Sequence, residues 1–145
     1  MGGGPLEKEV LITINGTHTD SDNITDTVSL KVSGQYFVRG EFTYLIYEEK
    51  IDESDEIIKS MIKLHDDCAV VTKRGAVDSS MVYKLGEDTF NHYATPYGVL
   101  KMDIHTDEIM IIETEDRLDI TIEYYMATKG SRITTCSMEI VVTPL

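Results

Sequence analysis

The stretch Leu118-Asp119-Ile120-Thr121-Ile122-Glu123-Tyr124 alternates strictly between apolar and polar side chains. Successive side chains of a β-strand point to opposite faces, so this period of two predicts a strand with one buried face. The same alternation recurs in residues 10–14, 28–33, 100–106 and 136–142. The only stretch compatible with a helix is 52–64, and there we favour a strand from Ile57 onward. The chain is therefore predicted to be all-β.

Short turn signals rich in Gly, Pro, Asp and Asn separate these runs. They are Asp20–Asn23, Arg39-Gly40, Asp52–Glu56, Asp66-Asp67, Arg74-Gly75, Leu85–Asp88, Thr95–Gly98, Glu115-Asp116 and Lys129-Gly130. Strands joined by such turns predict a single closed antiparallel meander β-barrel of about eight to ten strands, because closure removes exposed edges. The predicted core comprises Val10, Ile12, Ile14, Leu30, Val32, Met61, Val70, Met81, Leu100, Met102, Ile104, Ile120, Ile122 and Ile140.

Length and composition indicate one domain. The chain has 145 residues, 41% of them hydrophobic, which suffices for one core. We expect the barrel to span residues 9–145 and residues 1–8 to be a disordered or cloning-derived terminus. No run of 18 apolar residues predicts a transmembrane helix, and the start of the chain lacks the pattern of a signal peptide.

The formal net charge is −13, from 26 acidic and 13 basic residues. Such a surface repels nucleic-acid backbones and anionic lipids, so neither is expected as a partner. It is typical of a soluble cytoplasmic protein. Cys68 and Cys136 lie in unrelated contexts, and we expect both to be reduced; a disulfide between them stays possible but unnecessary.

Several short motifs occur in an order typical of one protein family. They are Gly34–Tyr36, Tyr44–Glu49, Arg74–Val77, Met81 with Tyr83, Tyr93–Gly98, the strand 100–106 and Glu123-Tyr124. In this order and spacing, over roughly residues 11–142, the chain resembles the YwiB-like family, a bacterial domain of unknown function. The resemblance implies a calycin-like (lipocalin or fatty-acid-binding-like) β-barrel with an internal ligand cavity. It implies no catalytic residues.

Arg74 is the best candidate for contacting a ligand. If Val70, Thr72 and Arg74 share an interior face, the guanidinium would end in the cavity or at its rim. It could there pair bidentately with a carboxylate. The alternative is an ion pair with a neighbouring acid, or a turn residue beside Gly75.

The segment Thr95-Pro96-Tyr97-Gly98 predicts a tight turn, in which Gly98 takes a positive φ. Tyr97 would then cover the end of the barrel, or place its hydroxyl at a cavity mouth. Tyr83 and Tyr124 could line a pocket with apolar walls and polar tips. They could equally be ordinary strand residues, because tyrosine is a good strand former.

No motif predicts a metal, a cofactor or a catalytic residue. The histidines His18, His65, His92 and His105 are isolated, and Asp20–Asn23 lacks the glycine and glutamate of a calcium loop. Nucleophile elbows and phosphate loops are absent from the sequence. We therefore expect the protein not to be an enzyme.

Two functions remain open. The first is a binding module that holds a small hydrophobic or carboxylate ligand inside the barrel. The second is a structural or interaction protein, monomer or homodimer, whose barrel is filled by side chains and which acts through its surface. The first predicts an interior cavity, and the second a packed interior with an exposed apolar patch or a long unpaired edge strand.

Overall fold

The computed structural model describes residues 8–50, 55–75, 78–95, 98–128 and 131–145, with the backbone alone at 92–95, 100, 131 and 132. Ten antiparallel strands follow one another, and strand β4 begins at Ile57, as predicted. The strands are β1 (Lys8–Asp20), β2 (Thr25–Arg39), β3 (Phe42–Lys50), β4 (Ile57–His65), β5 (Cys68–Gly75), β6 (Asp78–Lys84), β7 (Asp88–Thr95), β8 (Gly98–Glu113), β9 (Leu118–Thr128) and β10 (Ser131–Pro144).

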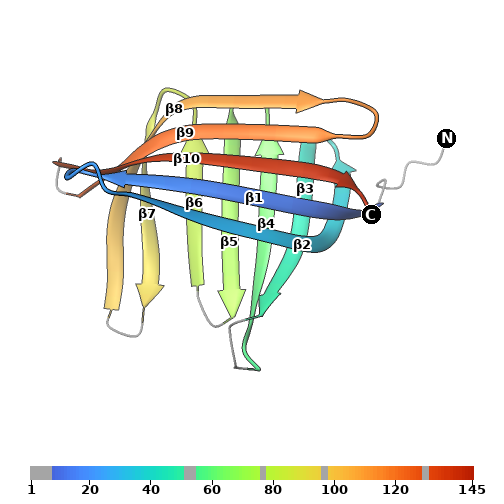
Figure 1. Ribbon diagram of the computed structural model, residues 1–145, viewed down its shortest axis with the longest axis horizontal. Helices are drawn as coiled ribbons and strands as arrows, with labels where there is room; N and C mark the ends of the chain where they lie inside the picture. The colour runs from blue at the N-terminus through green and yellow to red at the C-terminus, as the bar shows by residue number, and fades with distance from the viewer. Residues whose placement is uncertain (1–7, 51–54, 76–77, 96–97, 129–130) are drawn as a thin grey trace.

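Each strand pairs with its sequence neighbour, and β1 pairs with β10, which closes the barrel. The predicted closed antiparallel barrel is therefore confirmed. Figure 1 shows two layers: β1, β2 and β8–β10 run across the view, and β3–β7 run transversely behind them. The described part of the chain contains no helix that is long and apolar enough to cross a membrane.

Two long strands, β2 and β8, pass from one layer into the other (Figure 1). In β2, Gly34 pairs with both Val10 of β1 and Tyr47 of β3. A Cβ at Gly34 would approach the Ile46 carbonyl oxygen to 2.5 Å and Ile12 Cδ1 to 2.7 Å. Only glycine allows this close approach. In β8 the pairing register with β9 shifts between Thr106 and Glu108, which marks a β-bulge.

The turn between β1 and β2 is the polar loop that the sequence predicted. The Asp20 carboxylate accepts hydrogen bonds from the backbone N–H groups of Asp22 and Ile24, at 2.9 and 3.0 Å. Asn23 takes a positive φ of 61°. The Asp20 carboxylate thus accepts hydrogen bonds from turn N–H groups that have no partner in the β-ladder. Its oxygens therefore have a structural role that does not involve a metal.

Isoleucines dominate the barrel interior. Ile12, Ile120, Ile122 and Ile140 come from three adjacent strands and are at most 1% exposed. The predicted core residues Val10 and Ile104 are also buried, Met102 is half-buried, and only the backbone of Leu100 is described. The remaining predicted residues that pack against this core are partly buried: Ile14, Leu30, Val32 and Met81.

The prediction that Met61 and Val70 belong to the core is wrong. In β4 the buried set is Ser60, Ile62 and Leu64, so Met61 faces outward. In β5 the buried residues are Ala69 and Val71, so Val70 faces outward. Both strands carry apolar side chains on both faces, and an offset of one residue exchanges the faces.

Candidate functional site

The position of Arg74 follows from which side chains of β5 point into the barrel. Because Ala69 and Val71 point inward, the face shared by Val70, Thr72 and Arg74 is the outer one, and Arg74 is exposed. The condition for a guanidinium inside the barrel is therefore not met. The placement of Arg74 gives no support to an interior pair with a carboxylate ligand.

Tyr97 lies outside the described residues, so its role in a turn or at a cavity mouth stays a prediction. Gly98, which follows it, takes a positive φ of 128°, as predicted.

Tyr83 and Tyr124 meet inside the barrel. Their ring centroids lie 4.8 Å apart in an edge-to-face arrangement, and the residues are 4% and 6% exposed. Buried Tyr47 lies close enough to interact electrostatically with Tyr83, and Cys136 with Tyr124. We call Tyr47, Tyr83, Tyr124 and Cys136 the inner tyrosine cluster.

Burial governs the protonation of this cluster. It raises the pKa of Tyr83 to about 12 and that of the Cys136 thiol to about 11. Burial and the nearby Glu49 charge raise the pKa of Tyr47 to about 12. The pKa of Tyr124 rises further, first through burial and then through Tyr83 and Cys136. At neutral pH the cluster therefore carries uncharged hydroxyls and a thiol, which suits hydrogen bonding and not nucleophilic attack.

Two hydroxyls beside the cluster are buried without a partner. Ser60, 1% exposed, is paired in register with Tyr47, and Thr106, fully buried, is paired with Tyr124. Within the described part of the chain, neither side-chain oxygen has a hydrogen bond of acceptable geometry. Ser60 is near enough to Tyr47 to lower the pKa of that phenol against the effect of burial, but the contact does not satisfy its own hydroxyl.

Among the histidines whose side chains are described, His65 and His105 have acidic neighbours, and His65 Nε2 lies 3.8 Å from both Glu41 Oε2 and Asp66 Oδ2. His105 Nδ1 lies 2.6 Å from Asp88 Oδ1, and His105 Nε2 lies 3.4 Å from Asp107 Oδ1. His18 Nδ1 lies 3.4 Å from Cys136 Sγ. No group of three or more histidine, cysteine or acidic side chains among the described residues is placed to hold a metal.

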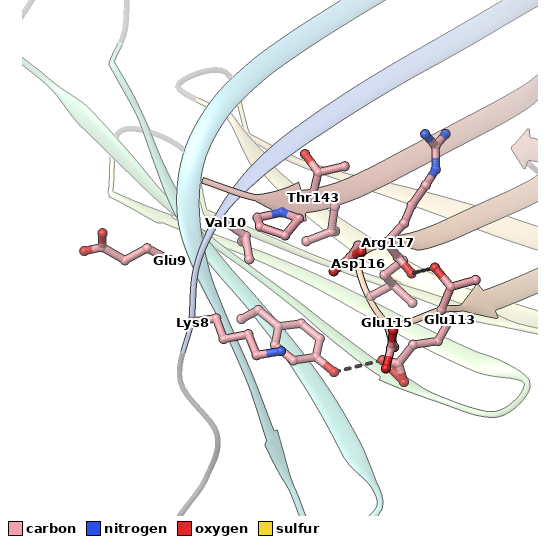
Figure 2. A pocket seen from close by; sticks show the side chains of 13 residues that line it. Lys8, Glu9, Val10, Glu113, Glu115, Asp116, Arg117 and Thr143 are labelled. Atoms are coloured by element: carbon pink, nitrogen blue, oxygen red, sulfur yellow. Dashed lines mark hydrogen bonds between the residues drawn. The ribbon is translucent and has the colours of Figure 1, made fainter.

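A cleft of about 250 Å³ opens at the end of the barrel where the β8–β9 turn meets β1, β2 and the end of β10 (Figure 2). We call it the barrel-end cleft. Its apolar lining comes from Val10, Leu118 and Val142, which are 4–5% exposed and belong to the core. The cleft thus gives solvent access to these core residues.

One hydrogen bond crosses the cleft between strands far apart in the sequence. The Tyr36 hydroxyl in β2 donates to Glu113 Oε2 in β8 at 2.9 Å (Figure 2). Burial, the hydrogen bond to Glu113 and its negative charge raise the pKa of Tyr36 to about 12. Tyr36 therefore remains a donor at neutral pH and orients the Glu113 carboxylate.

The charge of the cleft is negative. Four carboxylates line it, those of Glu9, Glu113, Glu115 and Asp116, against the two bases Lys8 and Arg117. Arg117 Nε bonds Asp119 Oδ2 at 2.8 Å, and Figure 2 shows the guanidinium directed away from Glu113. The potential at the cleft therefore favours a cation.

Sequence reasoning missed this cleft. Tyr36 was named within a family motif and Glu115-Asp116 as a turn, and the two were not connected. The signal that existed was the density of acids next to the apolar Leu118, but the pairing with Tyr36 depends on the closure of the barrel.

Comparisons with known proteins agree on one relationship. The family described as "Domain of unknown function (DUF1934)" matches residues 12–140. The "Uncharacterized beta-barrel protein YwiB" of Bacillus subtilis (strain 168) is 25% identical over 122 residues, which cover 83% of this chain and 84% of that protein. The crystal structure of the ywiB protein from Bacillus subtilis superposes with a TM-score of 0.83 and 22% identity, over 96% of this chain and 93% of that one. The resemblance predicted from the residues is confirmed.

Proposed function

The chain belongs to the DUF1934 family of unknown function, and we propose that it is a binding protein for a small molecule with an apolar body and a positively charged group. The proposed site is the barrel-end cleft. The observation that carries the proposal is the combination of a floor made of core residues with a carboxylate, Glu113, that is oriented by a hydrogen bond from Tyr36. The apolar part of the ligand would cover Val10, Leu118 and Val142, and its cation would pair with Glu113.

This proposal keeps the small, partly apolar ligand expected from the sequence but changes its place and its charge. The cleft lies at the end of the barrel, and acids outnumber bases in its lining. A volume of about 250 Å³ lies just below the usual range of about 300–1,000 Å³ for pockets that bind drug-sized ligands. The ligand is accordingly small.

We propose binding without catalysis, and a cytoplasmic location. The raised pKa of the Cys136 thiol keeps it protonated, and tyrosines with a raised pKa are poor general bases. Cys68 and Cys136 are free, which supports a reducing compartment.

Three probes with the same tail test the charge preference: octylamine, octanoate and octan-1-ol. Binding is followed by protein NMR, using amide shifts along β1 and the β8–β9 turn. We expect octylamine to bind most tightly, the alcohol more weakly and octanoate most weakly, because the lining carboxylates repel a like charge. Equal or tighter binding of octanoate would overturn the proposal.

Glu113→Gln is the sharpest variant, because glutamine keeps an acceptor for the Tyr36 hydroxyl and removes only the charge. We expect it to weaken octylamine binding about tenfold and to leave octan-1-ol binding unchanged. Glu139→Gln is the matched control, since Glu139 is exposed on β10 and does not line the cleft. If both variants affect octylamine equally, general surface charge explains the binding and the site is wrong.

A further inference from the structure

We propose that the exposed edge of β8, residues Asp107–Glu113, binds an extended peptide segment that has basic residues at its ends and apolar residues in its middle. The peptide would add a strand to the barrel beside β8. This inference concerns a different class of partner, and its surface meets the small-molecule site at Glu113.

The edge arises because β8 extends beyond the residues that pair with β7. β7 pairs with β8 only from Gly98 to His105. The carbonyl oxygen of Thr106 then accepts a hydrogen bond from Gly86 N at 2.9 Å, in the β6–β7 turn. From Asp107 to Glu113, the described strands offer β8 only one partner, β9.

The backbone groups left on this edge can be identified. Thr114 N donates to Arg117 O at 2.8 Å, which makes these two residues a hydrogen-bonded pair of the β8–β9 hairpin. Hydrogen-bonded and non-hydrogen-bonded pairs alternate along an antiparallel ladder. The N–H and C=O groups of Ile109, Ile111 and Glu113 therefore point away from β9, toward the open side.

There is room beside the edge for a strand. A groove of about 550 Å³ lies between β8 and the turns that join β2 to β3 and β4 to β5. Ile109 and Ile111 form its β8 wall, with Leu64 and His65 opposite. On the outer face of the same edge, Met110 and Ile112 are 47% and 51% exposed. An added strand would cover apolar side chains on both of its faces.

The carboxylates around the edge and the groove favour a peptide with basic residues. Asp107, Glu108 and Glu113 lie at the two ends of the edge, and Glu41 and Asp66 line the far side of the groove. The groove lining contains no lysine or arginine among the described residues. Lysine or arginine at the ends of a bound strand would therefore meet carboxylates, while its middle would meet isoleucine and methionine.

A second copy of this chain fits the same edge poorly. Antiparallel self-pairing centred on Met110 would place Asp107 opposite Glu113 and leave Glu108 opposite Ile112. Like charges directly opposite each other destabilise a strand pair. The other long edge, the first part of β2, carries both Asp26 and Lys31 and lacks this uniform sign.

The test uses a labelled peptide, Lys-Lys-Val-Thr-Val-Thr-Lys-Lys, and fluorescence anisotropy with the full chain. We expect this peptide to bind, and the same peptide with Glu in place of Lys not to bind. N-methylation of alternate central residues removes backbone donors at constant charge and should weaken binding at least about tenfold. Equal binding of the N-methylated peptide, or of Lys-Lys-Gly-Ser-Gly-Ser-Lys-Lys, would mean charge attraction alone and would overturn strand addition.

Protein variants locate the site. Glu108→Lys should abolish binding of the lysine peptide, and the matched exposed control Glu139→Lys should weaken it far less. Because Glu108 does not line the barrel-end cleft, Glu108→Lys should bind octylamine like the wild type, so the two proposals fail or succeed separately. Sedimentation of the protein without peptide completes the test. If the wild type forms a dimer and Glu108→Lys alters that dimer, a second copy of the chain occupies the edge and the inference is overturned.

Discussion

The interior of the barrel has two regions of opposite character. One is aliphatic, built on Ile12, Ile120, Ile122 and Ile140, and contains no side-chain hydrogen-bonding groups. The other is the inner tyrosine cluster with the hydroxyls of Ser60 and Thr106, equally buried but polar. Burial stabilises the first region at any pH. In the second, the same burial raises pKa values and leaves hydroxyls without partners, so its contribution depends on pH and on hydrogen bonding.

The largest expected difference between the regions appears at alkaline pH. The pKa values of Tyr47, Tyr83 and Cys136 are raised in the folded protein to about 12, 12 and 11, from ordinary values of 10, 10 and 9. The unfolded chain therefore loses these protons first, so stability is full below about pH 9 and falls as pH rises toward 12. Each unit of pKa difference is worth about 1.4 kcal/mol. Urea unfolding at pH 7, 9, 10 and 11 measures the decline.

Tyr83→Phe should make this decline shallower, because one of the responsible groups is gone. Tyr44→Phe is the control, since Tyr44 is half-buried on the outer face and stacks on Phe37. If both variants follow the wild-type curve, Tyr83 does not contribute to the alkaline loss.

The aliphatic region should show the largest effect of a single substitution at neutral pH. Ile122→Ala removes buried methyl groups and should lower the free energy of unfolding by about 2–5 kcal/mol. Ile112→Ala, at a 51% exposed position on β8, should cost less than about 1 kcal/mol. Chemical denaturation of both variants gives the comparison, and similar losses would contradict the assigned facing of β8 and β9.

The unpartnered hydroxyls allow a smaller test with the opposite sign. Thr106→Val exchanges a hydroxyl for a methyl group of similar shape, so it should stabilise the protein by about 1 kcal/mol or leave its stability unchanged. A loss of more than about 1 kcal/mol would show that the Thr106 hydroxyl has a partner, such as a buried water. Thr121→Val, on the outer face of β9, controls for a general preference for valine in strands.

The smallest effect is expected for Arg74. Its side chain is exposed on the outer face of β5, so Arg74→Ala should change stability by less than about 0.5 kcal/mol. The Arg74→Ala variant should bind octanoate as tightly as the wild type does. A clear loss of octanoate binding would restore the ligand role that the sequence suggested for this residue.

The sequence pattern predicted strands well and their facing less well. Where apolar and polar residues alternate, as in 118–124, both the strand and its buried face were right. The runs Met61-Ile62 and Ala69-Val70-Val71 carry apolar residues in both phases, and there the wrong phase was chosen, which also placed Arg74 on an interior face. Local pattern alone cannot decide such a run, because the choice depends on which neighbours the strand meets.

The candidate site depended even more on long-range structure. Tyr83 and Tyr124 were named, but nothing local indicates that their rings touch. The bond from Tyr36 to Glu113 joins residues 77 positions apart. It exists because β2 and β8 both cross between layers (Figure 1). A motif search has no access to that geometry.

The pairing of β1 with β10 has a consequence for synthesis on the ribosome. Ile14 pairs with Ile140, and Leu145 N donates to Glu9 O at 3.3 Å, so β1 cannot complete its pairing until β10 has been synthesised. Contacts between such distant segments slow folding, and incomplete chains expose unpaired strands. Until β10 has emerged from the ribosome, the nascent chain is an open sheet with β1 and β9 at its edges, and we expect chaperones to be needed most at that stage.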